Sequence, residues 1–345
     1  MRGLRRCLTP FAPDQSGASS VLFDLGGMIV IVDAGGCAGN VCGFDEPRWS
    51  TRRSAIFSAG LRDMDAIMGR DDRLVAKLAS AADRIEASFV ALVGTPVPAV
   101  IGTDLAAVAT MATHACGLPA LAIDTDGMHL YDVGASKAYL ALFQAFATER
   151  GPVVPGRLGV VGATPLDLST THAGRLLRGR LRQEGWDDVV CYGAGASMDD
   201  VRAASTCERN LVVAPSGLAG ARWLERTYGT PLSVAYPLAD DLLAGLQLEG
   251  RRVLVCHQQV AADTLRERCE EAGAEVVVAS WFMLDDALAR PGDVHLDEED
   301  DLSRLVADGG FDVVVADTDM RALAPGFAGT WVDAPHFAVS GRLVP

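Results

Sequence analysis

Short apolar runs alternate along the chain with stretches whose apolar positions repeat at the period of a helix. The first three runs are short, contain β-branched residues and are followed by turn residues, at 28–32, 89–93 and 120–123. Such runs are typical of strands that are buried on both faces of a parallel sheet. Helical patterns lie between or after them, at about 71–85, 103–115 and 135–148.

The alternation starts again after Pro152 and Pro155, which are typical of a linker. The second series predicts strands at 158–161, 188–191, 211–213 and 232–236, with helices at about 170–184, 197–205 and 217–228. A third series follows Gly250, with a helix at about 260–272 and strands at 253–256, 275–279 and 311–316. The acidic run 297–301 is typical of a solvated helix start.

Three successive strand–helix–strand series predict an α/β chain of three Rossmann-like, doubly wound domains with parallel sheets. We place an N-terminal domain at 1–150, a middle domain at 151–247 and a C-terminal domain at 248–345. In such sheets ligands bind beyond the carboxyl ends of the strands. The loops after the predicted strands are therefore where functional residues are expected.

Composition excludes several classes of function. The 345 residues carry a formal net charge of −15, which disfavours nucleic acid as a partner because phosphate binding needs a positive surface. No run reaches the roughly 18 apolar residues of a membrane span, and no apolar segment follows the basic start of the chain as it does in a signal peptide. The eight cysteines are therefore expected to be reduced thiols of a cytoplasmic protein.

The loop after the first predicted strand has an unusual composition. Its residues 33–43 contain four glycines and two cysteines, among them Gly35, Gly36, Cys37 and Cys42. Glycine lets a backbone approach a ligand closely, and cysteine thiolates are the ligands of iron–sulfur clusters. The segment is equally consistent with a tight turn that holds two incidental cysteines. Spacing alone leaves both interpretations open.

The loops after the next two strands carry weaker signals. Thr95 lies in the proline-rich segment 94–104, which is consistent with a rigid turn followed by a helix cap. The third loop contains Asp124, Asp126 and His129. These residue types suit a metal or substrate site, and they also suit a solvated loop.

Other kinds of chemistry have little support. The segment 162–167 follows a strand but lacks the Gly-x-Gly-x-x-Gly spacing of a dinucleotide site. Ser216 lies in no Gly-x-Ser-x-Gly elbow, so hydrolase chemistry is not expected. Cys256 and His257 end a strand, where a metal-binding pair and a half-buried loop pair are both consistent with the pattern.

Several segments follow one another in a recognisable order. Asp-Ala-Gly-Gly-Cys at 33–37, Leu-Arg-Asp-Met-Asp-Ala-Ile-Met-Gly at 61–69 and Val-Ile-Gly-Thr-Asp at 100–104 come first. Further segments follow at 117–127, 211–216, 224–231, 311–316 and 334–336. This ordered set resembles the nitrogenase component 1 family, which includes nitrogenase large subunits, dark-operative protochlorophyllide reductase and the nickel-sirohydrochlorin reductive cyclase. The resemblance covers nearly the whole chain.

The resemblance implies a nitrogenase-like reductase subunit, acting on a substrate other than dinitrogen, that forms a homodimer or a heterodimer with a paralogue. It also implies an iron–sulfur cluster, of the 4Fe–4S type, near the pair interface, with electrons supplied by a separate ATP-dependent iron–sulfur protein. Cys37, beside Gly35 and Gly36, matches the family's loop cysteine. Cys7 lies near the position of an earlier ligand, and Cys42 is within reach of the same metal although it has no family counterpart.

The chain departs from the family pattern where a third cysteine is expected. Thr95 and Pro96 stand at that place. Completing the ligand set would then require Cys42, a carboxylate such as Asp33 or Asp45, or a partner chain.

Arg48 and Trp49 follow this loop and supply a charge and an aromatic ring for a substrate cavity or a docking face. The sequence assigns no catalytic residue and no substrate. A non-catalytic scaffold or carrier for a metal cluster or a tetrapyrrole is the alternative function. A solute-binding protein of similar three-layer shape is disfavoured by the missing signal peptide.

Overall fold

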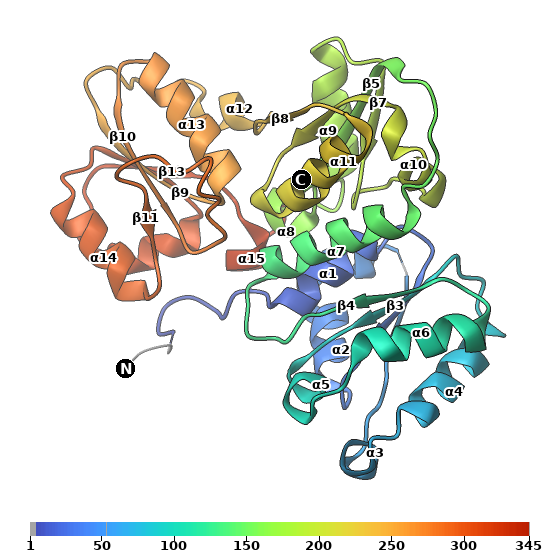
Figure 1. Cartoon of the computed structure of the whole chain (residues 1–345). Helices are drawn as coiled ribbons and strands as arrows, with labels where there is room; N and C mark the ends of the chain where they lie inside the picture. The colour runs from blue at the N-terminus through green and yellow to red at the C-terminus, as the bar shows by residue number, and fades with distance from the viewer. Residues whose placement is uncertain (1–4, 53, 345) are drawn as a thin grey trace.

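The computed structural model of the chain describes residues 5–52 and 54–344, which fold into three parallel β-sheets covered by helices (Figure 1). The predicted α/β architecture with three parallel-sheet units is confirmed. Within the described part of the chain, no helix is long and apolar enough to cross a membrane.

The first sheet has the strand order β2-β1-β3-β4. Its strands are β1 (Met28–Ile31), β2 (Ala55–Ser58), β3 (Val90–Val93) and β4 (Ala120–Ile123). β1 and β3 are buried along their whole length, because helices cover both faces of the sheet. The helices of this unit are α1 (Asp14–Leu22), α2 (Gly36–Asn40), the π-helix η1 (Val41–Asp45), the 3₁₀-helix η2 (Pro47–Ser50), α3 (Asp63–Met68), α4 (Asp71–Ala82), α5 (Pro96–Ile101), α6 (Leu105–Cys116) and α7 (Tyr131–Phe146).

The second sheet has the order β6-β5-β7-β8. Its strands are β5 (Val154–Val161), β6 (Asp188–Cys191), β7 (Cys207–Val212) and β8 (Leu232–Val234). β5 begins inside the segment predicted as a linker, because Val154 pairs with Cys207 of β7. The helices are α8 (Pro165–Leu168), α9 (Ala173–Gln183), α10 (Met198–Arg202), η3 (Ala204–Thr206), η4 (Pro215–Gly217), α11 (Leu218–Tyr228) and α12 (Ala239–Leu243).

The third sheet has the order β11-β10-β9-β12-β13. Its strands are β9 (Arg252–Cys256), β10 (Glu275–Ser280), β11 (Val294–His295), β12 (Val313–Ala316) and β13 (Thr330–Asp333). The acidic run predicted as a helix start leads into α14, as expected. The helices are α13 (Gln259–Glu271), α14 (Glu299–Asp308), η5 (Thr318–Leu323) and α15 (Phe337–Ser340).

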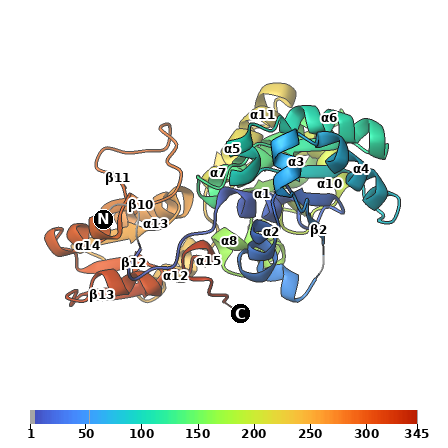
Figure 2. The ribbon, with the colours of Figure 1, turned by 90° about the horizontal axis from the view of Figure 1, so that it is seen from below.

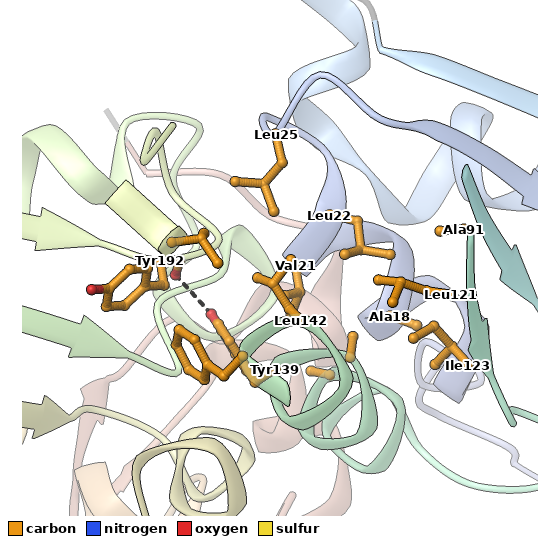
Figure 3. Packing of buried hydrophobic residues seen from close by; sticks show 14 of the residues in the cluster. Ala18, Val21, Leu22, Leu25, Ala91, Leu121, Ile123, Tyr139, Leu142 and Tyr192 are labelled. Carbon is orange, nitrogen blue, oxygen red and sulfur yellow. Dashed lines mark hydrogen bonds between the residues drawn. The ribbon is translucent and has the colours of Figure 1, made fainter. Parts of the chain in front are cut away.

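Helices α1 and α7 pack against each other and join the first two units into one core (Figure 3). Two glycines permit this close crossing. A Cβ atom on Gly17 would lie 1.8 Å from the carbonyl oxygen of Tyr131, and one on Gly134 would lie 1.8 Å from that of Asp14. α7 also packs against α11, and Tyr139 donates a hydrogen bond of 2.9 Å to the carbonyl oxygen of Tyr192. The first two units therefore have separate sheets but share one hydrophobic core.

The segment before α1 packs against the third unit, as the view from below shows (Figure 2). Leu8 and Phe11 join the core of that unit, and the ring of Phe11 lies 5.6 Å from that of Trp281. Thr9 donates a hydrogen bond of 3.2 Å to the carbonyl oxygen of Val339 in α15. The start of the described chain is thus tied to its end.

Candidate functional site

The glycine- and cysteine-rich loop after β1 forms a short helix that widens into a π-helix. Gly35 precedes α2 with φ +121°, a conformation that favours glycine. Cys37 lies in the first turn of α2, and Cys42 lies in the π-helix η1 that continues it. π-helical turns are rare and are frequent at functional sites.

Asp33 fixes the start of this loop. Its buried carboxylate accepts hydrogen bonds from the backbone N–H of Ala38, at 2.9 Å, and from the hydroxyl of Ser58, at 2.5 Å. These two bonds cap α2 and tie it to the end of β2. Asp45 lies at the other end of the helical segment and accepts bonds of 2.6 Å from Ser16 and 2.9 Å from Asn40.

Both thiols of the loop are half-buried and uncharged at neutral pH. Burial, and secondly the nearby carboxylate of Asp33, raises the pKa of the Cys37 thiol. Burial and the charge of Glu46 raise the pKa of Cys42 in the same way. A bound metal cation would reverse this effect, because it stabilises the thiolate form.

Thr95, from the loop after β3, reaches the Cys37 loop. Its buried hydroxyl donates to the carbonyl oxygen of Val32 at 2.8 Å, and it also forms a hydrogen bond with the Cys37 thiol. The structure therefore brings together two of the residues predicted from separate loops.

Three glycines of this helical segment leave one face bare. Gly36, Gly39 and Gly43 are spaced by three and four residues, so they share a helix face. A Cβ atom added at any of the three would meet no atom of the chain within 4 Å. Glycine within a helix costs about 1 kcal/mol relative to alanine. Packing within the chain does not explain these glycines, and they leave room for close approach from outside.

Exposed apolar side chains gather around the same edge of the first sheet. They follow the carboxyl ends of all four strands, which meet at one edge of a parallel sheet. Val100 is 85% exposed and Ile67 is 75% exposed. The set, named here the apolar edge, comprises Phe44, Met64, Ile67, Met68, Val100, Ile101 and Met128. Such a concentration of exposed apolar side chains marks an interaction surface.

Arg48 is buried and Trp49 is half-buried, and Arg48 lines a cavity of about 260 Å³. The Arg48 side chain is 1% exposed and forms an ion pair of 2.7 Å with Glu46 and one of 3.0 Å with Asp24. It also donates to the carbonyl oxygen of Gly193 in the second unit, at 2.8 Å. Trp49 packs edge-on against Phe23. Arg48 is thus a structural link between units.

Cys7 is exposed and lies on the segment that packs against the third unit. Its backbone N–H donates to the carboxylate of Glu299 at 3.1 Å. Among the residues that the structure describes, Cys7 joins no group of three potential metal ligands with Cys37 and Cys42. Cys37 and Cys42 are therefore the two thiols that one chain offers to a metal at this loop.

The loop after β4 gathers two of its three predicted residues. The ring nitrogen Nδ1 of His129 lies 3.0 Å from the Asp126 carboxylate. Asp14 joins them from the start of α1, and its carboxylate accepts hydrogen bonds from the backbone of Asp126 and Gly127. Asp124 is exposed, and its carbonyl oxygen accepts a hydrogen bond from Lys137.

A cavity of about 840 Å³ lies beside these loops. Its wall combines the segment before α1, the π-helix, the loop after β4 and the end of the chain. The lining residues are 9–13, Asn40, 43–45, Gly127 and 337–341.

Tyr131, Asp167, His257 and His336 form a buried polar network between the three units, which the sequence pattern did not reveal. The Tyr131 hydroxyl donates to Asp167 at 2.6 Å and lies 2.8 Å from Nε2 of His336. The rings of His257 and His336 stack with their centroids 4.5 Å apart. Burial raises the pKa of Asp167 to about 7 and lowers that of His257 to about 4.

The pH dependence of stability tests this network. Between about pH 4 and pH 6, folded Asp167 keeps a proton that the unfolded chain has lost, so its contribution to stability falls as pH rises. His257 is neutral when folded and protonated when unfolded, so its contribution rises over the same range. We expect Asp167→Asn to remove the contribution of Asp167, which falls as pH rises. As pH rises from 4 to 6, the unfolding free energy of the variant should therefore increase, relative to that of the unmodified protein, by up to about 1.4 kcal/mol per pH unit.

Denaturant unfolding at intervals from pH 4 to pH 7 measures this difference. Asp124→Asn, at an exposed position, is the matched control and should give a curve parallel to that of the unmodified protein. A parallel curve for Asp167→Asn as well would mean that Asp167 is ionised when folded.

The fold places the chain among α/β proteins with three parallel-sheet units. In this chain the distinctive glycine- and cysteine-rich loop follows the first strand. The family model for nitrogenase component 1 type oxidoreductases matches residues 14–239, so the chain belongs to this family. The predicted resemblance is confirmed.

Two further comparisons agree with the family. The chain is 26% identical over 280 residues to the nitrogenase iron-molybdenum cofactor biosynthesis protein NifE of Klebsiella pneumoniae, and the match covers 71% of this chain and 56% of that protein. It thus spans little more than half the length of that relative. Nitrogenase Cp1 at pH 6.5 superposes with a TM-score of 0.73 at 12% identity, covering 97% of this chain and 87% of that one. Nitrogenase Cp1 at pH 5 gives 0.68 at 14% identity, over 96% and 84%.

Proposed function

We propose that this chain is a subunit of a nitrogenase-like reductase that binds an iron–sulfur cluster through Cys37 and Cys42 and shares it with a second copy. The observation that carries the proposal is the pair of half-buried thiols beside the bare glycine face of α2 and η1. Family membership supports an oxidoreductase. The substrate, which we expect not to be dinitrogen, is left open.

The donor set suits a cluster that lies between two chains. A 4Fe–4S cluster takes four cysteine thiolates. Within residues 5–52 and 54–344, neither Cys37 nor Cys42 belongs to a group of three Cys, His, Asp or Glu side chains that could hold a metal ion. Two copies related by a two-fold axis would bring four thiols together, because such an interface joins the same patch of each copy. The cluster would supply one-electron transfer, and Thr95 and Asp33 would position the Cys37 loop.

The apolar edge suits the interface of such a pair. Its residues lie on the helices after β1, β2 and β3 and, for Met128, in the loop after β4. Burying it against the same edge of a second copy would remove these side chains from water. A paralogous chain with a similar edge would serve the same role in a heterodimer.

The source of electrons follows from the family. A separate ATP-dependent iron–sulfur protein is the proposed donor, and the cytoplasm is the proposed location.

A scaffold or carrier is the second candidate. The NifE relative is a cofactor biosynthesis protein, and the cavity of about 840 Å³ beside the Cys37 loop has room for a ligand that is handed on. A scaffold would bind its cluster or tetrapyrrole but reduce nothing when the ATP-dependent donor is added.

Anaerobic reconstitution with iron and sulfide tests the cluster. We expect about two iron and two sulfide per chain, since one 4Fe–4S cluster would serve two chains. Cys37→Ser and Cys42→Ser should each lose most of this iron. Cys116→Ser is the matched control, because Cys116 is also half-buried but ends α6 away from the loop. Iron binding by Cys37→Ser equal to that of the control would refute the assignment.

Gly39→Ala tests the bare face through its effect on pairing. A helical glycine replaced by alanine should stabilise the separate chain by up to about 1 kcal/mol. Gly179→Ala, at an exposed position of α9 with open space around its Cβ, is the matched control. We expect both variants to be at least as stable as the unmodified chain, but only Gly39→Ala to weaken pairing, measured by sedimentation. Unchanged pairing in Gly39→Ala would mean that the face is not at the interface.

A further inference from the structure

Three side chains from two elements gather in the first unit at a distance suited to one metal ion. One ligand atom from each of Asp14, Asp126 and His129 lies within 4.8 Å of those of the other two. Asp14 begins α1, and the other two residues lie in the loop after β4. In the part of the chain that the structure describes, this is the only such group of three.

The backbone holds these residues in place without any ion. The segments before α1 and before α7 pair through Pro13 and Leu130, and the N–H of Asp14 donates to the carbonyl oxygen of His129 at 3.0 Å. The Asp14 carboxylate accepts bonds of 2.9 Å and 2.8 Å from the N–H groups of Asp126 and Gly127. Gly127 has φ +72°, which allows the tight turn that brings Asp126 and His129 together.

Gln15 supplies an independent sign of a missing ligand. Gln15 is only 5% exposed, yet its amide oxygen Oε1 has no hydrogen-bond partner. This oxygen lies 3.4 Å from the position that a Cβ atom on Gly127 would take, so it points at the turn between Asp126 and His129. A buried polar atom without a partner is costly, and a cation would provide the partner.

The charge balance also calls for a cation. Two carboxylates lie close together, and like charges at such a distance repel each other. Among the described residues, no Lys or Arg forms an ion pair with Asp14 or Asp126, and the ion-pair partner of Asp126 is His129. A divalent ion would neutralise both carboxylates and leave the imidazole neutral as a ligand.

We propose that Asp14, Gln15, Asp126 and His129 bind one divalent transition-metal ion, at a site distinct from the thiols of the Cys37 loop. Three oxygen donors and one imidazole favour Mn²⁺, Fe²⁺ or Zn²⁺ over Mg²⁺, which prefers oxygen ligands and retains its waters. The imidazole of His129 turns from Asp126 towards the ion when it binds.

The site is open on one side. Asp14 and Gln15 lie buried beneath it, while the side chains of Asp126 and His129 are 31% and 53% exposed. The ion can therefore enter from solvent and keep positions for water or for an oxygen atom of a ligand. Gly127, between the two exposed residues, lines the cavity of about 840 Å³, so a ligand in that cavity would lie next to the ion.

Titration with Mn²⁺ tests the site. Chelator-treated protein is titrated while the six-line electron paramagnetic resonance signal of free Mn²⁺ is followed, because this signal is lost on binding. We expect one site per chain, and at least about tenfold weaker binding for Asp126→Asn and for His129→Gln. Gln15→Leu should weaken binding as well. Asp124→Asn changes an exposed carboxylate of the same loop and should bind as the unmodified protein does.

Two controls separate the metal site from folding and from the cluster. Thermal unfolding of each variant by circular dichroism should show a single transition near that of Asp124→Asn. Cys37→Ser should retain the Mn²⁺ site, because Mn²⁺ prefers oxygen and nitrogen to thiolate ligands. The proposal is overturned if the unmodified protein binds no Mn²⁺, if Asp126→Asn binds as tightly as Asp124→Asn, or if Cys37→Ser abolishes binding.

Discussion

Gly134→Ala is expected to destabilise the protein by about 3 kcal/mol or more, at the upper end of what overpacking usually costs. The added Cβ atom would lie 1.8 Å from the carbonyl oxygen of Asp14. That oxygen belongs to the backbone of α1, so no side chain can turn away to relieve the clash. The helices α1 and α7 would have to separate, and the core that they share with both sheets would loosen.

Gly17→Ala should have a similar effect from the opposite helix, because its Cβ atom would lie 1.8 Å from the carbonyl oxygen of Tyr131. Both substitutions force the same separation, so the double variant should cost less than the sum of the two. Equilibrium unfolding in denaturant measures all three variants, with Gly179→Ala as the control in open space. Destabilisation no larger than that of the control would show that the helices can shift at little cost.

Arg48→Met is expected to destabilise the protein by about 3–5 kcal/mol, as is usual when one partner of a buried ion pair is removed. Methionine retains much of the side-chain volume, so the loss would come mainly from charge. Glu46, which is 2% exposed, would keep a buried carboxylate without its guanidinium partner. The hydrogen bond from Arg48 to Gly193, which links the first two units, would also be lost.

Two variants isolate the buried charge as the cause. Arg48→Met combined with Glu46→Gln should regain part of the lost stability, because the unpaired carboxylate is gone. Arg52→Met removes an arginine that is 47% exposed and pairs with Asp24 at 3.1 Å, and should cost at most about 1 kcal/mol. Denaturant unfolding compares the three. A loss in Arg48→Met no greater than in Arg52→Met would contradict the structural role of this ion pair.

Elements whose pattern was periodic and apolar were predictable from the sequence. The short runs that became β1, β3 and β9 lie in sheet interiors, where burial on both faces demands continuous apolar residues. The elements whose bounds were not predicted lack this pattern. α1 is buried on every side yet contains Asp14, Gln15 and three serines, so it has no apolar stripe. The edge strand β2 has only Ile56 buried.

The candidate site was likewise predictable only in part from the sequence. The Cys37 loop was visible because glycines and cysteines concentrate within a few residues, and the apolar run before it predicted that the loop follows a parallel strand. Local composition could not show that Arg48 is buried or that Cys7 packs against Glu299 in the third unit. It also could not place Asp14 beside Asp126, which stands 112 positions further along the chain.

Tertiary packing decided these last relations, for a physical reason. Hydrophobic periodicity and turn residues act over one element and the next, and they fix which segments become strands and helices. Distances between residues far apart in the chain depend on how complete units pack, here through the glycine-mediated crossing of α1 and α7. The sequence thus determined the family, the three sheets and the cysteine loop, whereas the buried network and the Asp14 site arose only when the units came together.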